Sequence, residues 1–249
     1  MLRTQPYTLL LAFLLAGQVH SDSGNVRTVF SSGAQRVALI ELFTSEGCSS
    51  CPPADRWLSG LKTDPDLWKD FVPVAFHVDY WDYIGWKDRF SRPEYSDRQR
   101  RYAEEGGARV VYTPGFFYQG KDWRGWRGAK SAQVDKVRIG ELSVLIDDDG
   151  AAIHFNSLDP GLKRLNAHVA LLGMNLETAV RAGENRGRKL KHDFVALNVV
   201  SVPLDKSASG YTAITELPEV ALDVQDIALA VWVSEVGAQM PIQSVGGYL

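Results

Sequence analysis

Two cysteines set close together are the residues of this chain best suited to chemistry. Cys48 and Cys51 are separated by two serines and are the only cysteines in the sequence. They follow an apolar segment and precede Pro52, and proline is favoured in the first turn of a helix. A thiol at a helix N-terminus meets unpaired backbone N–H groups and the positive end of the helix dipole, which favour the thiolate. We therefore expect Cys48 to be a nucleophile and Cys51 to resolve the mixed disulfide that Cys48 forms.

The residues of this motif leave the direction of the redox reaction open. Ser49 and Ser50 offer hydroxyl and amide groups to the Cys48 sulfur, which would favour the reduced protein, but spacing alone does not fix the potential. A purely structural disulfide is the weaker interpretation, because a bridge across so few residues removes little entropy from the unfolded chain. Reductase, oxidase and isomerase activities all fit the pair.

The N-terminal residues predict export. Residues 1–21 begin with one positive charge, Arg3, continue with an apolar run and end in small residues, which is the pattern of a signal peptide. The apolar run, residues 8–17, is about half as long as the roughly twenty residues that a bilayer requires. We expect cleavage of this segment and a mature chain in the periplasm or outside the cell, without stable membrane insertion.

Charge and composition exclude several classes of protein. The formal net charge of −3 provides no basic field for nucleic acid, and 45% hydrophobic residues are typical of one or two compact domains. The sequence contains no Gly-rich phosphate loop, no Gly-x-Ser-x-Gly elbow and no His-Glu-x-x-His pair. We expect no nucleic-acid partner and no cofactor, and take exported proteins or small-molecule thiols and disulfides as the partners of the cysteines.

Apolar patterning divides the mature chain into two parts. Residues 22–140 alternate strand and helix, with strands expected at 37–43, 71–78, 110–112 and 116–118 and helices at 53–61, 93–105 and 129–139. The rest is β-rich, with strands expected at 142–146, 151–155, 168–175, 194–202, 211–216 and 227–234. The pattern predicts one domain at 22–140 and a sandwich-like β-rich companion domain at 141–249.

The order of elements around the cysteines resembles the thioredoxin fold. Pro114 of the Thr113-Pro114 pair matches the cis-proline that faces the cysteines in that fold. More narrowly, the sequence looks like a bacterial family of secreted thioredoxin-like proteins of uncharacterised function, on motifs at 41–55, 77–88, 111–114 and 183–188. The resemblance implies an α/β thioredoxin-like domain whose catalytic site contains Cys48, Cys51, Thr113 and Pro114.

Glu41 interrupts the apolar strand that leads to the cysteines. A charged side chain at such a position either reaches solvent or is buried with a raised pKa. Thioredoxin-like proteins often keep a carboxylate near this point, beneath the resolving cysteine, as a proton relay. The resemblance implies this role for Glu41, and a strand-edge glutamate that faces water is the alternative.

His77 opens a segment of aromatic and acidic residues that follows the second predicted strand. Ligands of open α/β sheets gather at the carboxyl ends of strands, where Cys48 should also emerge. His77, Trp81 and Trp86 are therefore candidate substrate-binding residues. A small core that packs the segment onto the domain is an equal alternative, and His77 alone fits a structural histidine better than a catalytic or metal-binding one.

Residues 183–189, Gly-Glu-Asn-Arg-Gly-Arg-Lys, are rich in glycine and charge and predict a loop. The loop is either a solvated connection or a docking edge near the redox site.

Two functions fit these residues, and a third interpretation treats the chain as a non-catalytic binding module. The first is an exported thiol-disulfide oxidoreductase. The second is a periplasmic copper-binding or chaperone protein in which Cys48, Cys51 and His77 hold Cu(I), since thiolate and imidazole ligands suit that ion. The sequence favours the oxidoreductase, because two thiolates and one imidazole make a sparse metal site.

Overall fold

The structure, a computed structural model, describes residues 28–129, 131, 136–148 and 150–249. The predicted signal peptide, residues 1–21, lies outside the described residues. The described part holds two α-helices, α1 (Pro52–Gly60) and α2 (Pro93–Glu104). None of its helices is long and apolar enough to span a membrane.

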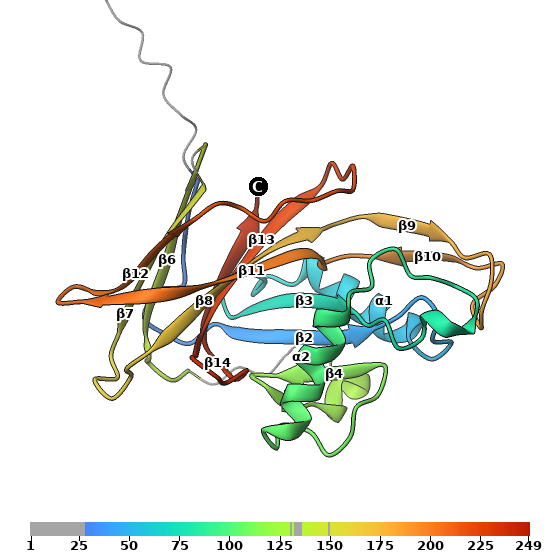
Figure 1. Cartoon of the computed structure of the whole chain (residues 1–249), viewed down its shortest axis with the longest axis horizontal. Coiled ribbons are helices and arrows are strands. Elements are labelled where there is room, and N and C mark those ends of the chain that lie inside the picture. The colour runs from blue at the N-terminus through green and yellow to red at the C-terminus, as the bar shows by residue number, and fades with distance from the viewer. Residues whose placement is uncertain (1–27, 130, 132–135, 149) are drawn as a thin grey trace, which may run out of the picture.

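Strands make up most of the regular structure (Figure 1). The strands of the first half are β1 (Thr28–Ser31), β2 (Ala38–Thr44), β3 (Phe71–His77), β4 (Gly115–Tyr118) and β5 (Lys121–Asp122). Those of the second half are β6 (Gly140–Asp147), β7 (Gly150–Ser157), β8 (Leu165–Gly173), β9 (Leu176–Ala179), β10 (Lys189–His192), β11 (Val195–Ser207), β12 (Gly210–Thr215), β13 (Ile227–Glu235) and β14 (Pro241–Tyr248). Short 3₁₀ turns lie at Leu61–Thr63, Asp82–Ile84 and Arg124–Gly128.

Strand β2 carries the cysteine motif at its carboxyl end and lies between β3 and β4. It pairs in parallel with β3 and antiparallel with β4. Every residue of β2 and β3 is buried, which is typical of strands covered on both faces. The side chains of Glu41 and Thr44 point to opposite faces of β2 and contact α2 and α1 respectively. The two helices therefore cover opposite faces of this part of the sheet.

The other edge of β3 pairs with β11 from the second half of the chain. Ala75 and Val195 are partners in parallel register. Strand β11 continues beyond this contact to pair with β8 and β12. The result is one twelve-stranded mixed sheet with the path β1-β6-β7-β12-β11-β3-β2-β4-β5, to which β8, β13 and β14 are joined beside β11.

This architecture corrects the predicted fold class. An α/β thioredoxin-like domain followed by a sandwich-like β-rich region is wrong, because β2–β5 belong to the same mixed sheet as the strands of the second half. The described chain is β-rich and has two α-helices. The prediction rested on local patterns, whereas the pairing of β3 with β11 joins segments far apart in the sequence, which no local pattern reports.

The hydrophobic cores show why the two halves are joined. Strand β13 is buried on both faces and contributes alternate residues to two cores. Ala228, Ala230 and Trp232 pack with β2, β3 and both helices, whereas the intervening side chains of β13 pack with β6, β7 and β12. A strand shared in this way fixes the cysteine-bearing strands to the C-terminal region.

Several single elements agree with the sequence prediction and others do not. The strands expected at 37–43 and 71–78 and the helices expected at 53–61 and 93–105 are present with small shifts at their ends. Residues 110–112 form no strand. The helix expected at 129–139 is absent from the described residues of that segment, and residues 130 and 132–135 lie outside the described part.

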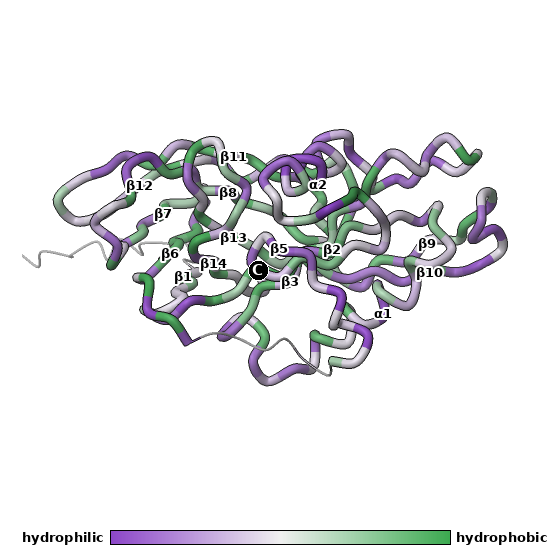
Figure 2. Tube along the Cα trace, turned by 90° about the horizontal axis from the view of Figure 1, so that it is seen from below, coloured by the Kyte–Doolittle hydropathy of each residue, from purple (hydrophilic) through white to green (hydrophobic). Residues whose placement is uncertain are grey.

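The hairpin β9–β10 stands apart from the twelve-stranded sheet. Its two strands pair with each other and with no other described strand. It extends away from the sheet in Figure 1, and Figure 2 shows that it is largely hydrophilic. Asn175 and Phe194, at its two ends, have left-handed φ angles of 53° and 58°. The chain therefore bends sharply where it leaves and rejoins the body.

A buried ion pair ties α2 to β2. Glu41 is 0% exposed, and its Oε1 accepts a hydrogen bond of 2.6 Å from Arg98 Nε while its Oε2 accepts one of 2.5 Å from Tyr102. The Arg98 guanidinium also lies over the rings of Phe76 and Trp232, 5.5 and 5.0 Å from their centroids. The Glu41 side chain is fully enclosed and that of Arg98 is only 7% exposed, so each charge depends on the other.

We expect Arg98→Met to lower the free energy of unfolding by about 3–5 kcal/mol, because it leaves the Glu41 carboxylate buried without a counter-charge. The double variant Glu41→Leu/Arg98→Met should be more stable than Arg98→Met, since no uncompensated charge remains. Urea denaturation followed by circular dichroism measures both. Arg100→Met is the control: it removes an exposed pair with Asp97 and should change stability by less than about 1 kcal/mol. A double variant no more stable than Arg98→Met would contradict this account.

Candidate functional site

The cysteine motif occupies the turn from β2 into α1. Strand β2 ends at Thr44, residues 45–50 form a loop, and Cys51 is the N-cap residue of α1. Pro52 takes the first helical position, where a missing N–H leaves no hydrogen bond unmade. Both thiols are free, and Cys48 is 1% and Cys51 0% exposed. The pair is thus enclosed at the carboxyl end of β2.

The two thiols differ in acidity. The hydrogen bond from Cys51 lowers the pKa of Cys48 to about 6, helped by the hydroxyls of Ser50 and Thr113 and opposed by burial. Burial raises the pKa of Cys51 well above its ordinary value, and the hydrogen bond to Cys48 and the charge of Asp55 add to the rise. At neutral pH the pair therefore consists of a Cys48 thiolate and a Cys51 thiol.

The loop before β4 brings Thr113 and Pro114 to the cysteines. The Thr113–Pro114 peptide bond is cis. The Thr113 hydroxyl hydrogen-bonds the Cys48 sulfur and accepts a hydrogen bond of 2.7 Å from the indole of Trp81. The structure thus places four of the sequence-predicted residues, Cys48, Cys51, Thr113 and Pro114, in one site.

A different carboxylate from the one suggested by the sequence lies near Cys51. Thr44 Oγ1 donates a hydrogen bond of 2.8 Å to Asp55 Oδ1 and also lies within hydrogen-bonding reach of the Cys51 thiol. Asp55 follows Cys51 by one helical turn, so the two side chains share one side of α1. Glu41 points to the opposite face of β2 and pairs with Arg98. The structure does not bring Glu41 to the cysteines.

His77 is fully buried and pairs with Asp88. Its Nδ1 lies 2.6 Å from Asp88 Oδ2. Burial would lower the pKa of His77, but the Asp88 carboxylate outweighs burial and raises it to about 9. Burial would raise the pKa of Asp88, yet the positive charge of His77 lowers it. A side chain so enclosed does not reach a substrate, so the predicted substrate-binding role of His77 finds no support in its position.

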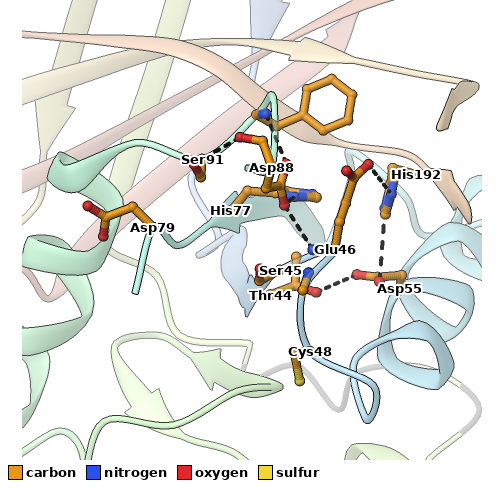
Figure 3. A network of polar contacts seen from close by, with 12 residues as sticks. Thr44, Ser45, Glu46, Cys48, Asp55, His77, Asp79, Asp88, Ser91 and His192 are labelled. Carbon is orange, nitrogen blue, oxygen red and sulfur yellow. Dashed lines mark hydrogen bonds and ion pairs between the residues drawn. The ribbon is translucent and has the colours of Figure 1, made fainter. Parts of the chain in front are cut away.

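A second buried imidazole comes from the hairpin β9–β10. His192 Nε2 lies 3.3 Å from Glu46 Oε1, and its Nδ1 lies 3.9 Å from Asp55 Oδ2. Its ring packs edge-to-face on that of His77, with 4.9 Å between the ring centroids. Figure 3 shows these carboxylates and imidazoles gathered on one side of the cysteine loop. Burial raises the pKa of Asp55, and the positive charges of His192 and His77 oppose that rise.

Side chains from two other segments fix the backbone of the cysteine loop. Asp88 Oδ2 accepts a hydrogen bond of 2.8 Å from the Glu46 amide. Asn185 Nδ2 donates to the carbonyls of Glu46 and Cys48, at 2.8 and 2.9 Å. Glu184 accepts a bond of 2.9 Å from the Ser49 amide. The segment predicted as a loop at 183–189 is the turn of the hairpin, and it holds the motif in place.

The aromatic residues after β3 pack against the site. Trp81 bonds Thr113, and Trp86 Nε1 donates a hydrogen bond of 2.8 Å to Glu46 Oε2. A Cβ added at Gly47 would lie only 3.0 Å from Trp81 Cβ, so a side chain at this position would require Trp81 to shift. Both indoles are partly exposed at the rim of the site, and they belong to a packed layer that supports the cysteine loop.

The residues of this site that were missed from the sequence include Asp55, Asp88, Asn185 and His192. Asp55 had a usable signal, because it follows Cys51 by four residues in a predicted helix. The other three come from separate segments, and only tertiary contacts bring them to the cysteines.

The predicted copper ligands do not form a site of their own. His77 Nδ1 is engaged by Asp88, and the two thiols are engaged with each other. In the part of the chain that the structure describes, no group of three or more His, Cys, Asp or Glu side chains could hold a metal ion. Copper binding therefore stays a prediction from the sequence.

The His77–Asp88 pair should make stability depend on pH. Because the pKa of His77 is raised to about 9, its contribution is fully present below its ordinary pKa of 6.5 and is lost as pH rises through about 9. The stability difference between wild type and His77→Gln should shrink across this window by on the order of 3 kcal/mol.

Denaturant titrations at several pH values in that window test this expectation. His168→Gln is the control, because burial lowers the pKa of His168 to about 3 and its effect should not vary with pH in the same window. A difference between wild type and His77→Gln that stays constant with pH would contradict the assigned pairing.

Comparisons with known proteins place the chain in a family. Residues 39–234 match the family described as Protein of unknown function (DUF1223). No curated protein matches the sequence. The fold is similar to the crystal structure of a protein from Agrobacterium tumefaciens, with 24% identity, a TM-score of 0.60, and coverage of 86% of this chain and 94% of that one. It is also similar to HBP35 of Porphyromonas gingivalis, with 13% identity, a TM-score of 0.58, and coverage of 88% of this chain and 76% of that one.

These comparisons correct the predicted family resemblance. Neither structural neighbour is described as a thioredoxin, and at these identities the likeness shows the fold alone. Together with the large mixed sheet, this overturns the assignment to a thioredoxin-like family. The family match spans most of the chain, and the protein therefore belongs to the DUF1223 family, a family of unknown function.

Proposed function

We propose that the protein is an exported thiol-disulfide oxidoreductase in which Cys48 attacks and Cys51 resolves. The observation that carries this proposal is the placement of two free thiols at the start of α1, with Cys48 Sγ 3.2 Å from the Ser50 hydroxyl. Hydrogen bonds there lower the pKa of Cys48 to about 6, while burial raises that of Cys51. The thiolate is the attacking species in disulfide exchange, so the pair is prepared for it at neutral pH. A disulfide whose only role is to stabilise the fold would not require this difference between the pKa values of the two thiols.

The proposed reaction has two steps. The Cys48 thiolate bonds to one sulfur of a substrate disulfide, and the other substrate sulfur leaves as a thiolate. The Cys51 thiol then loses its proton to a base, and its sulfur attacks Cys48, which releases the second substrate sulfur as a thiolate. The substrate disulfide gains two electrons, and Cys48 and Cys51 lose them by forming a disulfide. The reverse sequence oxidises a dithiol substrate.

The proposed substrates follow from the expected location and from the burial of the site. The signal peptide predicted at 1–21 would direct the chain to the periplasm or outside the cell, where protein disulfides form and persist. Exported proteins and small-molecule thiols or disulfides are therefore the proposed partners. Cys48 is 1% exposed, so a substrate disulfide reaches it only when the loop at 45–50 opens locally.

In reduced protein we expect Cys48 to alkylate with an inflection near pH 6 and Cys51 to react far more slowly at neutral pH. Cys51→Ala should move the Cys48 inflection to higher pH, because it removes the hydrogen bond that contributes most to the low pKa. Ser50→Ala is the matched control and should give a smaller shift in the same direction. Iodoacetamide labelling, read for each cysteine by mass spectrometry across a pH series, measures these rates. Faster labelling of Cys51 would reverse the assigned roles.

Cells that express Cys51→Ala should accumulate mixed disulfides between Cys48 and exported proteins, because the resolving step is blocked. These complexes would appear as high-mass bands on non-reducing gels and vanish on reduction. Cys48→Ala also lacks one thiol and is the matched control, from which such bands should be absent. The same band pattern in both variants, at equal expression, would exclude the proposed exchange reaction.

A further inference from the structure

The resolving step of the proposed function, on which this inference rests, requires a base that removes the Cys51 proton. Cys51 is 0% exposed, so bulk water does not reach its thiol. The Thr44 hydroxyl lies within hydrogen-bonding reach of Cys51 and donates to Asp55 Oδ1 at 2.8 Å. A proton that leaves Cys51 therefore has a short path through one hydroxyl to the Asp55 carboxylate.

Asp55 accepts a proton only while it is ionised, and most of its surroundings oppose ionisation. The residue is 6% exposed, and burial raises its pKa, with a further contribution from the Asp88 carboxylate. The groups that oppose this rise are the positive charges of His192 and His77 and the hydrogen bond from Thr44. His77 is engaged by Asp88 at 2.6 Å, which leaves His192 as the positive group facing Asp55 from β10.

His192 is enclosed between two carboxylates, those of Glu46 and Asp55, and the ring of His77. His192 is 2% exposed, and neither ring nitrogen has a hydrogen-bond partner with good geometry among the described residues. Glu46 Oε1, 3.3 Å from Nε2, is also without one. An imidazolium at this position is attracted by Glu46 on one side and Asp55 on the other, and is opposed by the His77 ring, whose centroid lies 4.9 Å away.

We propose that His192 is a positioning residue for disulfide exchange, whose imidazolium keeps Asp55 ionised so that Asp55 can take the Cys51 proton. The proton passes from Cys51 Sγ through the Thr44 hydroxyl to Asp55 Oδ1 as the Cys51 sulfur bonds to Cys48. The departing substrate thiolate takes its proton from solvent. When the disulfide is reduced again, the proton on Asp55 returns to the Cys51 sulfur. The hairpin β9–β10 thus sets the pH range in which the mixed disulfide is resolved.

Reduced protein mixed with dithiobis(nitrobenzoate) separates the two steps. Attack by Cys48 releases one coloured thiolate, and resolution by Cys51 releases the second, so absorbance should rise in two phases in the wild type. Cys51→Ala should show the first phase alone. Following both rates across a pH series gives the ionisation that controls each step.

His192→Gln keeps a polar side chain but removes the charge. We expect the first phase to be unchanged and the second to slow by about tenfold at neutral pH, because a smaller fraction of Asp55 is then ionised. The inflection of the second phase should move to higher pH. His192→Asn should reproduce this effect, and Asp55→Asn should slow the second phase and remove the inflection.

His168→Gln is the matched control, since His168 is a buried histidine held by the hydroxyls of Ser201 and Ser234 rather than by carboxylates. It should alter neither phase. A first phase with the rate and inflection of the wild type shows that the His192 variants remain folded around Cys48, because an unfolded chain would give Cys48 the ordinary pKa of a thiol. A second phase in folded His192→Gln with the rate and inflection of the wild type would overturn the role of His192. A wild type without a second phase would overturn the proposed exchange reaction itself.

Discussion

The backbone of the cysteine loop is buried, and its polar groups must find partners in other parts of the chain. Residues 45–48 are enclosed, and a buried amide or carbonyl without a partner is strongly unfavourable. Asp88 accepts from the Glu46 amide, and Asn185 donates to the carbonyls of Glu46 and Cys48. This requirement draws the segment after β3 and the hairpin β9–β10 onto the motif. The hairpin also carries His192 to Asp55, whereas His77 is placed beside Thr44 by the pairing of β3 with β2.

The same requirement creates a dense group of buried charges. Glu46, Asp55 and Asp88 are enclosed together with His77 and His192. Each imidazole lies beside a carboxylate, His77 beside Asp88 and His192 between Glu46 and Asp55, while the two imidazole rings also pack against each other. Such an arrangement loses stability when a single member is removed. Its presence directly behind a pair of thiols is more easily understood as part of proton chemistry than as a means of stabilising the fold.

Sequence patterns predicted the structure correctly where it depends on contacts between residues close together in the sequence. The position of the cysteines between β2 and α1 follows from an apolar run and Pro52, and Thr113–Pro114 lies where the motif order suggested. The fold class was not predictable in this way, because it depends on the pairing of β3 with β11. Neither β3 nor β11 carries a sequence pattern that identifies the strand with which it pairs.

The carboxylate near Cys51 shows the same limit of prediction from sequence within a single strand. Glu41 is the acidic residue of β2 and was therefore the predicted proton relay, but its side chain faces α2. Thr44, three residues on, faces α1 and reaches Asp55. Alternation along the strand fixes these directions, yet the sequence does not say which face of β2 carries the helix that bears Cys51.

The isolation of the hairpin β9–β10 from the large sheet has a consequence for both the cysteine loop and Asp55. Among the described strands the hairpin pairs with none but itself, and left-handed residues at Asn175 and Phe194 bend the chain at its two ends. Contacts of its side chains hold it to the body: Asp193 pairs with Lys62 at 2.8 Å, and Glu184 and Asn185 bond the backbone of the cysteine loop. The same hairpin carries His192 to Asp55. A change in the position of this one element would therefore alter the shape of the cysteine loop and the charge beside Asp55 together.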